Sequence, residues 1–247
     1  MNKSLKGLPG EAVQDTSDSE KLQSLISALG SKDENTCRNA YQSLVAIGEP
    51  AVPLLVEALT STNEKIRWET SRLLNEIKVD WTPYANDKTI DALISDLNSR
   101  NGFERIRARQ SLVRIGSKTV GGLIQALSSK EDLKRWEAAK ALTKIGDSSA
   151  TEALIKALID NNFDIRWLAA EGLISIGEPA LEPLLHELIK NSDSERLREG
   201  AHHVFHDLNN EKLKALLGPV LHALDDIESH LEVPLAAESA LNSLPKR

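Results

Sequence analysis

Apolar residues along this chain recur every three to four positions and are interrupted by short polar stretches. Around residues 135–146, Ala138, Leu142 and Ile145 follow Arg135 at offsets of three, seven and ten residues. These offsets lie on one face of an α-helix, whereas a half-buried β-strand alternates apolar and polar residues. The pattern therefore predicts helices, and we expect an all-α fold.

The same pattern occurs seven times, which indicates an internal repeat. The residue at offset zero of each copy is Cys37, Arg67, Arg105, Arg135, Arg166, Arg198 or Pro234. A second apolar-periodic segment precedes each copy, at residues 22–29, 52–59, 90–97, 120–127, 150–159, 181–189 and 213–224. Each repeat is therefore predicted to be a pair of helices, which we call helix A and helix B.

Turn residues punctuate the repeats consistently. Serine followed three residues later by an acid predicts a capping box at the start of helix B; these segments are 31–34, 61–64, 129–132 and 192–195. Glycine after the last apolar residue of helix B predicts a left-handed C-cap, at Gly48, Gly116, Gly146 and Gly177. Pro50 and Pro179 are expected in the first turn of the next helix A.

The pattern Arg-x-x-Ala-x-x-x-Leu-x-x-Ile-Gly, with a period near 30 residues, resembles the short HEAT-like repeats named after phycobilisome lyases. The resemblance covers residues 20–244. It implies a right-handed α-α superhelix, an α-solenoid of about seven helix pairs whose B helices line a concave surface, and many members are non-catalytic scaffolds. We expect residues 1–19 to form a disordered polar tail and residues 20–247 to form the solenoid.

Three of the four tryptophans directly follow the arginine of helix B, and a long side chain stands four residues after each. Tryptophan beside arginine is typical of interface hot spots. We therefore predict that a protein or peptide partner binds the concave surface through Trp68, Arg72, Trp136, Lys140, Trp167 and Glu171. The alternative is that the indoles pack across the turn between helices A and B, with each arginine bonded to a turn carboxylate such as Asp132 or Asp164.

An insertion at residues 78–85 separates the second and third repeats and contains Trp81, Pro83 and Tyr84. Inserted loops often carry recognition. The alternative is a loop that folds back over the junction between the two repeats. The sequence alone leaves both readings open.

The composition narrows the function further. The 247 residues carry a formal net charge of -7, which argues against a nucleic-acid partner, and no apolar run is long enough to span a membrane. Cys37 is the single cysteine, which excludes an internal disulfide. We expect a cytoplasmic protein. Residues 100–118 hold six basic residues and one acid, and form either an electropositive patch or a solvated helix face.

Catalytic and metal chemistry finds little support. His202 and His206 are four residues apart on one helix and are a weak metal candidate. Deoxyhypusine hydroxylase, an enzyme built of HEAT-like repeats, binds iron through His-Glu pairs, but this chain has Trp68-Glu69 and Trp136-Glu137 at the matching positions. We therefore expect no cofactor and no catalytic activity. The alternative function is a phycobilin-lyase-like enzyme subunit that handles a prosthetic group, which an absorbance spectrum of the purified chain would reveal.

Overall fold

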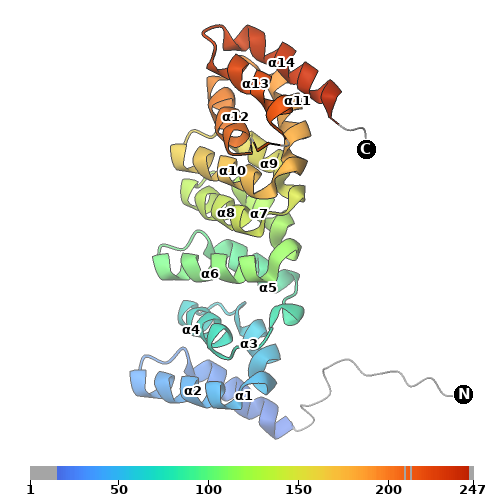
Figure 1. Cartoon of the computed structure of the whole chain (residues 1–247). Helices are drawn as coiled ribbons and strands as arrows, with labels where there is room; N and C mark the ends of the chain where they lie inside the picture. The colour runs from blue at the N-terminus through green and yellow to red at the C-terminus, as the bar shows by residue number, and fades with distance from the viewer. Residues whose placement is uncertain (1–15, 209, 212, 245–247) are drawn as a thin grey trace, which may run out of the picture. The chain divides into compact units, whose positions relative to one another are not determined.

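The computed structural model describes residues 16–208, 210–211 and 213–244 (Figure 1). These residues form fourteen α-helices and five 3-10 turns without a β-strand, so the predicted all-α fold is confirmed for them. The chain divides into two compact units, residues 1–96 with 101–111 and residues 97–100 with 112–247. The single domain predicted for residues 20–247 stays a prediction.

The first unit contains two layers of helices. Its elements are α1 (Thr16–Ala28), α2 (Glu34–Ile47), η1 (Glu49–Ala51), α3 (Val52–Ala58), α4 (Glu64–Glu76), η2 (Thr82–Tyr84), α5 (Asp87–Asp96) and residues 102–111 of α6 (Gly102–Ile115). Helices A (α1 and α3) pack on each other, and so do helices B (α2 and α4). Helix α1 begins at Thr16, so residues 16–19, which were expected in the polar tail, are helical, and residues 1–15 lie outside the described residues.

The second unit continues the alternation. Its elements are η3 (Gly116–Thr119), α7 (Val120–Leu127), α8 (Asp132–Ile145), η4 (Ser148–Ala150), α9 (Thr151–Ala157), α10 (Phe163–Ile176), η5 (Glu178–Ala180), α11 (Leu181–Lys190), α12 (Glu195–Leu208), α13 (Lys214–Asp225) and α14 (Ser229–Ser243). Helices α7, α9 and α11 form one layer, and helices α8, α10 and α12 form the other (Figure 1).

The repeated apolar face is the core of both units. The residues at offsets three and seven of helix B are buried in the first six repeats: Ala40, Leu44, Thr70, Leu74, Ala108, Leu112, Ala138, Leu142, Ala169, Leu173, Ala201 and Phe205. A small residue at offset three lets the neighbouring helix approach, while the larger one at offset seven fills the space. The sequence pattern thus identified the packed face correctly.

The four glycines after helix B all have positive φ, as predicted. Gly146 is in the left-handed helical conformation, with φ 65° and ψ 25°. Gly48 and Gly177 instead combine positive φ with ψ of -133° and -142°, a conformation in which side chains are strained. Pro50 and Pro179 lie in the 3-10 turns that lead into α3 and α11, where no amide hydrogen is needed.

The predicted capping boxes are wrong in register. The N-cap of α2 is Asp33, which accepts from the amide of Thr36, and the N-cap of α4 is Asn63. The hydroxyls of Ser31 and Ser61 lie two residues earlier and accept the amide of the N-cap residue itself, at 3.1 and 3.2 Å. Asp and Asn are good N-caps, so each takes the capping position and the serine closes the preceding turn.

The last repeat is also arranged differently from the prediction, which made the segment after Pro234 a helix B. Helix α13 packs on α12 and α14, whereas α14 packs on α13 and on α11, which is a helix A. The final pair is therefore in reverse order. The sequence pattern correctly places Ala237 on the buried face of α14. It does not determine which layer of helices α14 joins.

The inserted loop folds back rather than standing out as a recognition element. Trp81 is 1% exposed and is among the largest fully buried side chains of the described residues. The turn that follows it, η2, contacts α3. Pro83 is exposed and Tyr84 is half-buried. The burial of Trp81 therefore favours the alternative in which the loop folds back, with its indole in the core.

Candidate functional site

In the first unit, Trp68 is covered by two arginines. The guanidinium of Arg107 lies 4.5 Å from the centroid of the indole, and that of Arg72 lies 5.9 Å away. Arg72 also lies 4.2 Å from the centroid of the Tyr41 ring. The indole is half-buried, and its N–H is buried without a hydrogen-bond acceptor. Trp68 is therefore held by cation–π contacts on the surface of α4.

Glu69 is the carboxylate beside this stack. It is buried and accepts a hydrogen bond from Arg72 at 3.2 Å. Burial raises the pKa of Glu69, and the neighbouring cations oppose that shift. Burial, followed by the nearby charge of Arg72, lowers the pKa of Arg107. Arg72 therefore pairs with this buried carboxylate, and the charge of Arg107 also favours its ionised form.

A groove of about 750 Å³ adjoins the stack and is lined by residues of α2 and α4, among them Tyr41, Trp68 and Arg72. The Tyr41 hydroxyl donates to Glu76, and burial together with this hydrogen bond raises the pKa of Tyr41. Cys37 also lines the groove, but its thiol donates to the carbonyl of Leu29, and burial raises its pKa. The groove can hold side chains of a partner, while Cys37 is unsuited to nucleophilic chemistry.

In the second unit, Trp167 on α10 is 49% exposed. Its ring centroid lies 4.4 Å from that of His203 on α12, with the planes tilted by 30°. Nε2 of His203 is 3.0 Å from Oε1 of Glu171, one turn along α10 from the tryptophan. Because these three side chains hold one another, the indole is oriented while much of it stays open to solvent.

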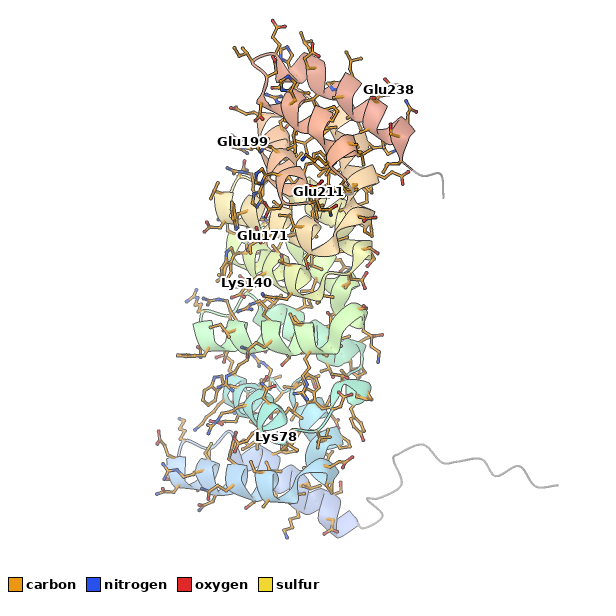
Figure 2. The ribbon with its side chains drawn as sticks, in the orientation of Figure 1. Lys78, Lys140, Glu171, Glu199, Glu211 and Glu238 are labelled. Carbon is orange, nitrogen blue, oxygen red and sulfur yellow. The ribbon has the colours of Figure 1, made fainter. Side chains whose placement is uncertain are left out.

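Two further aromatic residues flank this cluster on neighbouring turns and helices. Phe163 lies one turn before Trp167 on α10 and is 63% exposed. Trp136 on α8 is half-buried, and Nζ of Lys140 lies 4.5 Å from the centroid of its ring. Figure 2 shows Lys140, Glu171 and Glu199 projecting from one side of the second unit, from α8, α10 and α12.

The structure therefore separates the predicted binding residues into two groups. Trp68 and Arg72 belong to the first unit, while Trp136, Lys140, Trp167 and Glu171 belong to the second. His203 and Phe163 were not among the predicted site residues. The signal for His203 was its offset of five residues in helix B of the next repeat, the same offset as that of Glu171.

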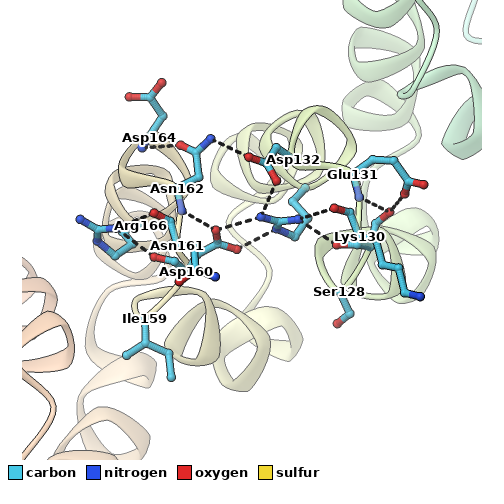
Figure 3. A network of polar contacts seen from close by, with 12 residues as sticks. Ser128, Lys130, Glu131, Asp132, Ile159, Asp160, Asn161, Asn162, Asp164 and Arg166 are labelled. Carbon is cyan, nitrogen blue, oxygen red and sulfur yellow. Dashed lines mark hydrogen bonds and ion pairs between the residues drawn. The ribbon is translucent and has the colours of Figure 1, made fainter.

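The arginines at offset zero fix the turn between helices A and B, as the packing alternative expects (Figure 3). Four of them donate to the carbonyl six residues earlier: Arg67 to Ser61, Arg135 to Ser129, Arg166 to Asp160 and Arg198 to Ser192. The expected bond of Arg135 to Asp132 is present at 2.9 Å. Arg166 bonds backbone carbonyls rather than Asp164. These arginines are structural and are not free for a ligand.

Nothing in the described part of the chain brings three or more histidine, cysteine or acidic residues into a metal-binding group. The rings of His202 and His206 lie 6.2 Å apart, centroid to centroid. His202 is 3.1 Å from Asp225, and His206 is 3.2 Å from Asp207. Each ring of the weak metal candidate thus faces its own carboxylate.

Several basic side chains of the segment at residues 100–118 already contact other residues. Arg107 stacks on Trp68, and Arg105, Arg109 and Arg114 each have an interaction with another group.

Among the helices of the described residues, none is long and apolar enough to cross a membrane.

Comparison with known proteins gives a family match. The family model described as HEAT repeats matches residues 90–165 and 120–205. No curated protein matches significantly.

Three solved structures illustrate the similarity. An archaeal HEAT-like repeats protein from Thermococcus onnurineus NA1 is 16% identical, with a TM-score of 0.44 over 89% of this chain and 98% of that one. An engineered protein is 22% identical, with a TM-score of 0.43 over 76% of this chain and 96% of that one. Human deoxyhypusine hydroxylase is 22% identical, with a TM-score of 0.40 over 78% of this chain and 75% of that one.

Proposed function

Because this chain belongs to the HEAT-repeat family, we propose that it is a non-catalytic scaffold that binds a protein or peptide segment on its B-helix surfaces. HEAT repeats generally mediate protein binding. In the second unit the proposed binding residues are Trp136, Lys140, Trp167 and Glu171. In the first unit Trp68 and Arg72, which line the groove, form a separate contact.

The observation that carries the proposal is the oriented, half-exposed indole of Trp167. A large exposed aromatic ring buries much apolar area on binding, and its two side-chain torsions lose little entropy when they are already fixed. His203 and Glu171 fix them here. Phe163, one turn away, enlarges the apolar surface that a partner can cover.

Trp136 has a different role in this surface. Its ring is half-buried and its face is covered by the Lys140 ammonium, so it supports the surface more than it offers contact area. Replacing Trp136 by alanine should therefore cost folding stability as well as binding. Replacing Trp167 should cost mainly binding.

The test uses a phage-displayed random peptide library selected on the full chain. Dissociation constants of the selected peptides are then measured for the wild type, Trp167→Ala and the control Phe103→Ala, which removes an exposed aromatic residue from the first unit. We expect Trp167→Ala to weaken binding by about tenfold or more, equivalent to about 1.4 kcal/mol, and Phe103→Ala to leave it unchanged.

Urea unfolding followed by circular dichroism completes the test. Trp167→Ala should lose less than about 1 kcal/mol of stability, because its side chain is half exposed. If no peptide is enriched, if enriched peptides bind Trp167→Ala as well as the wild type, or if that variant unfolds, Trp167 is not a binding residue.

A further inference from the structure

The last helix of the second unit, α14, carries an exposed apolar stripe outside the B-helix layer. Ile227, just before the helix, is 99% exposed, and Leu231 and Leu235 are 56% and 65% exposed. The spacing of four residues places Leu231 and Leu235 along one side of the helix, and Ile227 lies in the turn that precedes it. Glu238, three residues after Leu235, lies at the end of the stripe on the same side of the helix, and Figure 2 shows it projecting from α14.

The opposite side of α14 is already used for packing. Val233, Ala237 and Ala240 are buried, and the helix contacts α11 and α13. By helical spacing these residues lie on the other side from Leu231 and Leu235. The stripe is therefore a second apolar face that the described part of the chain does not cover.

The charged side chains on α14 itself and in the turn before it are all acidic. Glu228 and Glu232 are exposed on one flank, and neither forms an ion pair through its side chain with another described residue. Asp225 and Asp226 precede the stripe, and Asp225 faces His202 at 3.1 Å. The sequence contains no lysine or arginine between residues 215 and 245. The exposed apolar residues of α14 are thus flanked by carboxylates of the same helix and of the turn before it, while Arg198 and His202 of α12 lie near the start of the helix.

We propose that the outer face of α14 binds a basic amphipathic helix of a partner protein. The apolar side chains of that helix cover Ile227, Leu231 and Leu235, and its lysines or arginines pair with Glu232 and Glu238. Along the helix axis, residues 229–238 span about 14 Å, which matches about two and a half turns of a partner helix. Charge complementarity of this kind raises the association rate and selects against acidic partners.

The same charges argue against a second copy of the chain as the occupant. In a two-fold symmetric contact the face of α14 would meet itself. The carboxylates of both copies would then be brought together without a counter-ion, which is unfavourable.

The experiment uses two synthetic helical peptides that share leucines at positions i, i+4 and i+7. One carries lysines and the other glutamates on the flanks. Fluorescence anisotropy measures their binding to the full chain at low and high salt. We expect the lysine peptide to bind, its affinity to fall with added salt, and the glutamate peptide not to bind.

Three double variants locate the binding. Leu231→Gln with Leu235→Gln should weaken the lysine peptide by about tenfold or more. Glu232→Gln with Glu238→Gln should weaken binding and reduce its salt dependence. The control, Phe103→Gln with Ile106→Gln, removes exposed apolar residues from α6 and should have no effect.

Four results overturn the proposal: no binding of the lysine peptide, equal binding of the two peptides, binding unaffected by the leucine substitutions, or binding lost equally in the α6 control. Sedimentation velocity tests the other occupant. Self-association of the wild type that is abolished by Leu231→Gln with Leu235→Gln would show that a second copy covers the face. If the peptide selection fails to support Trp167 as a binding residue, the test of α14 still stands, because the two surfaces consist of different residues.

Discussion

Arg135 on α8 is linked by two hydrogen bonds to Asp160, which lies in the turn that follows α9 of the next repeat. Nε of the arginine lies 2.8 Å from one carboxylate oxygen and Nη2 lies 3.1 Å from the other. Both side chains are nearly buried, at 13% and 11% exposure. The same guanidinium bonds the carbonyls of Ser129 and Lys130. The Arg135 side chain therefore connects the turn of its own repeat with the turn of the next repeat.

Replacing this arginine should destabilise the second unit. Arg135→Lys keeps the charge but cannot reproduce the forked contact, and Asp160 is left without its bidentate partner. We expect a loss of about 2–4 kcal/mol in the free energy of unfolding, measured by urea denaturation. Lys144→Ala, at an exposed position of the same helix, is the control and should change stability by less than about 0.5 kcal/mol. Equal effects in the two variants would contradict the role assigned to Arg135.

The pair also predicts a pH dependence. Burial, the largest single cause, would raise the pKa of Asp160, but the hydrogen bonds from Arg135 and from the amide of Asn162, together with the charges of Arg135 and Arg166, outweigh it and hold the pKa below its ordinary value of 3.8. A carboxyl group with a lowered folded-state pKa adds stability above its unfolded pKa and loses that contribution as the pH falls through the folded value. The stability difference between the wild type and Asp160→Asn should be constant from about pH 5 to 7 and shrink below about pH 4. Urea titrations across this range measure it, and a difference that grows on acidification has the wrong sign.

The helix pairs could be predicted from the sequence because the same positions of each repeat are buried. Ala138 and Leu142 recur at fixed offsets in helix B, so one helical face describes every copy. Exposure of the tryptophans could not be predicted, since the same position meets different neighbours. Arg107 covers Trp68 in the first unit, whereas His203 meets Trp167 in the second. These neighbours come from the next repeat, where the pattern leaves the residue type unspecified.

A matched pair of glycines tests the turn geometry. Gly177 follows α10 with φ 79° and ψ -142°, while Gly121 lies inside α7, and a Cβ at either position would meet nothing within 4 Å. Any effect of alanine is therefore a backbone effect. Gly177→Ala should cost about 1–3 kcal/mol because side chains disfavour this conformation. Gly121→Ala should stabilise by about 0.5–1 kcal/mol, because alanine favours a helix interior. Thermal unfolding distinguishes these opposite signs, and two changes in the same direction would refute the backbone explanation.

The buried loop indole gives the last prediction. Trp81 is 1% exposed, so Trp81→Ala should leave a cavity in the first unit and lower the free energy of unfolding by about 3–5 kcal/mol. Pro83, exposed in the same loop, provides the control, and Pro83→Ala should cost less than about 1 kcal/mol. Circular dichroism should follow the unfolding, because removing a tryptophan alters the fluorescence signal. If Trp81→Ala kept its stability but lost the binding of selected peptides, the loop would be a recognition element after all.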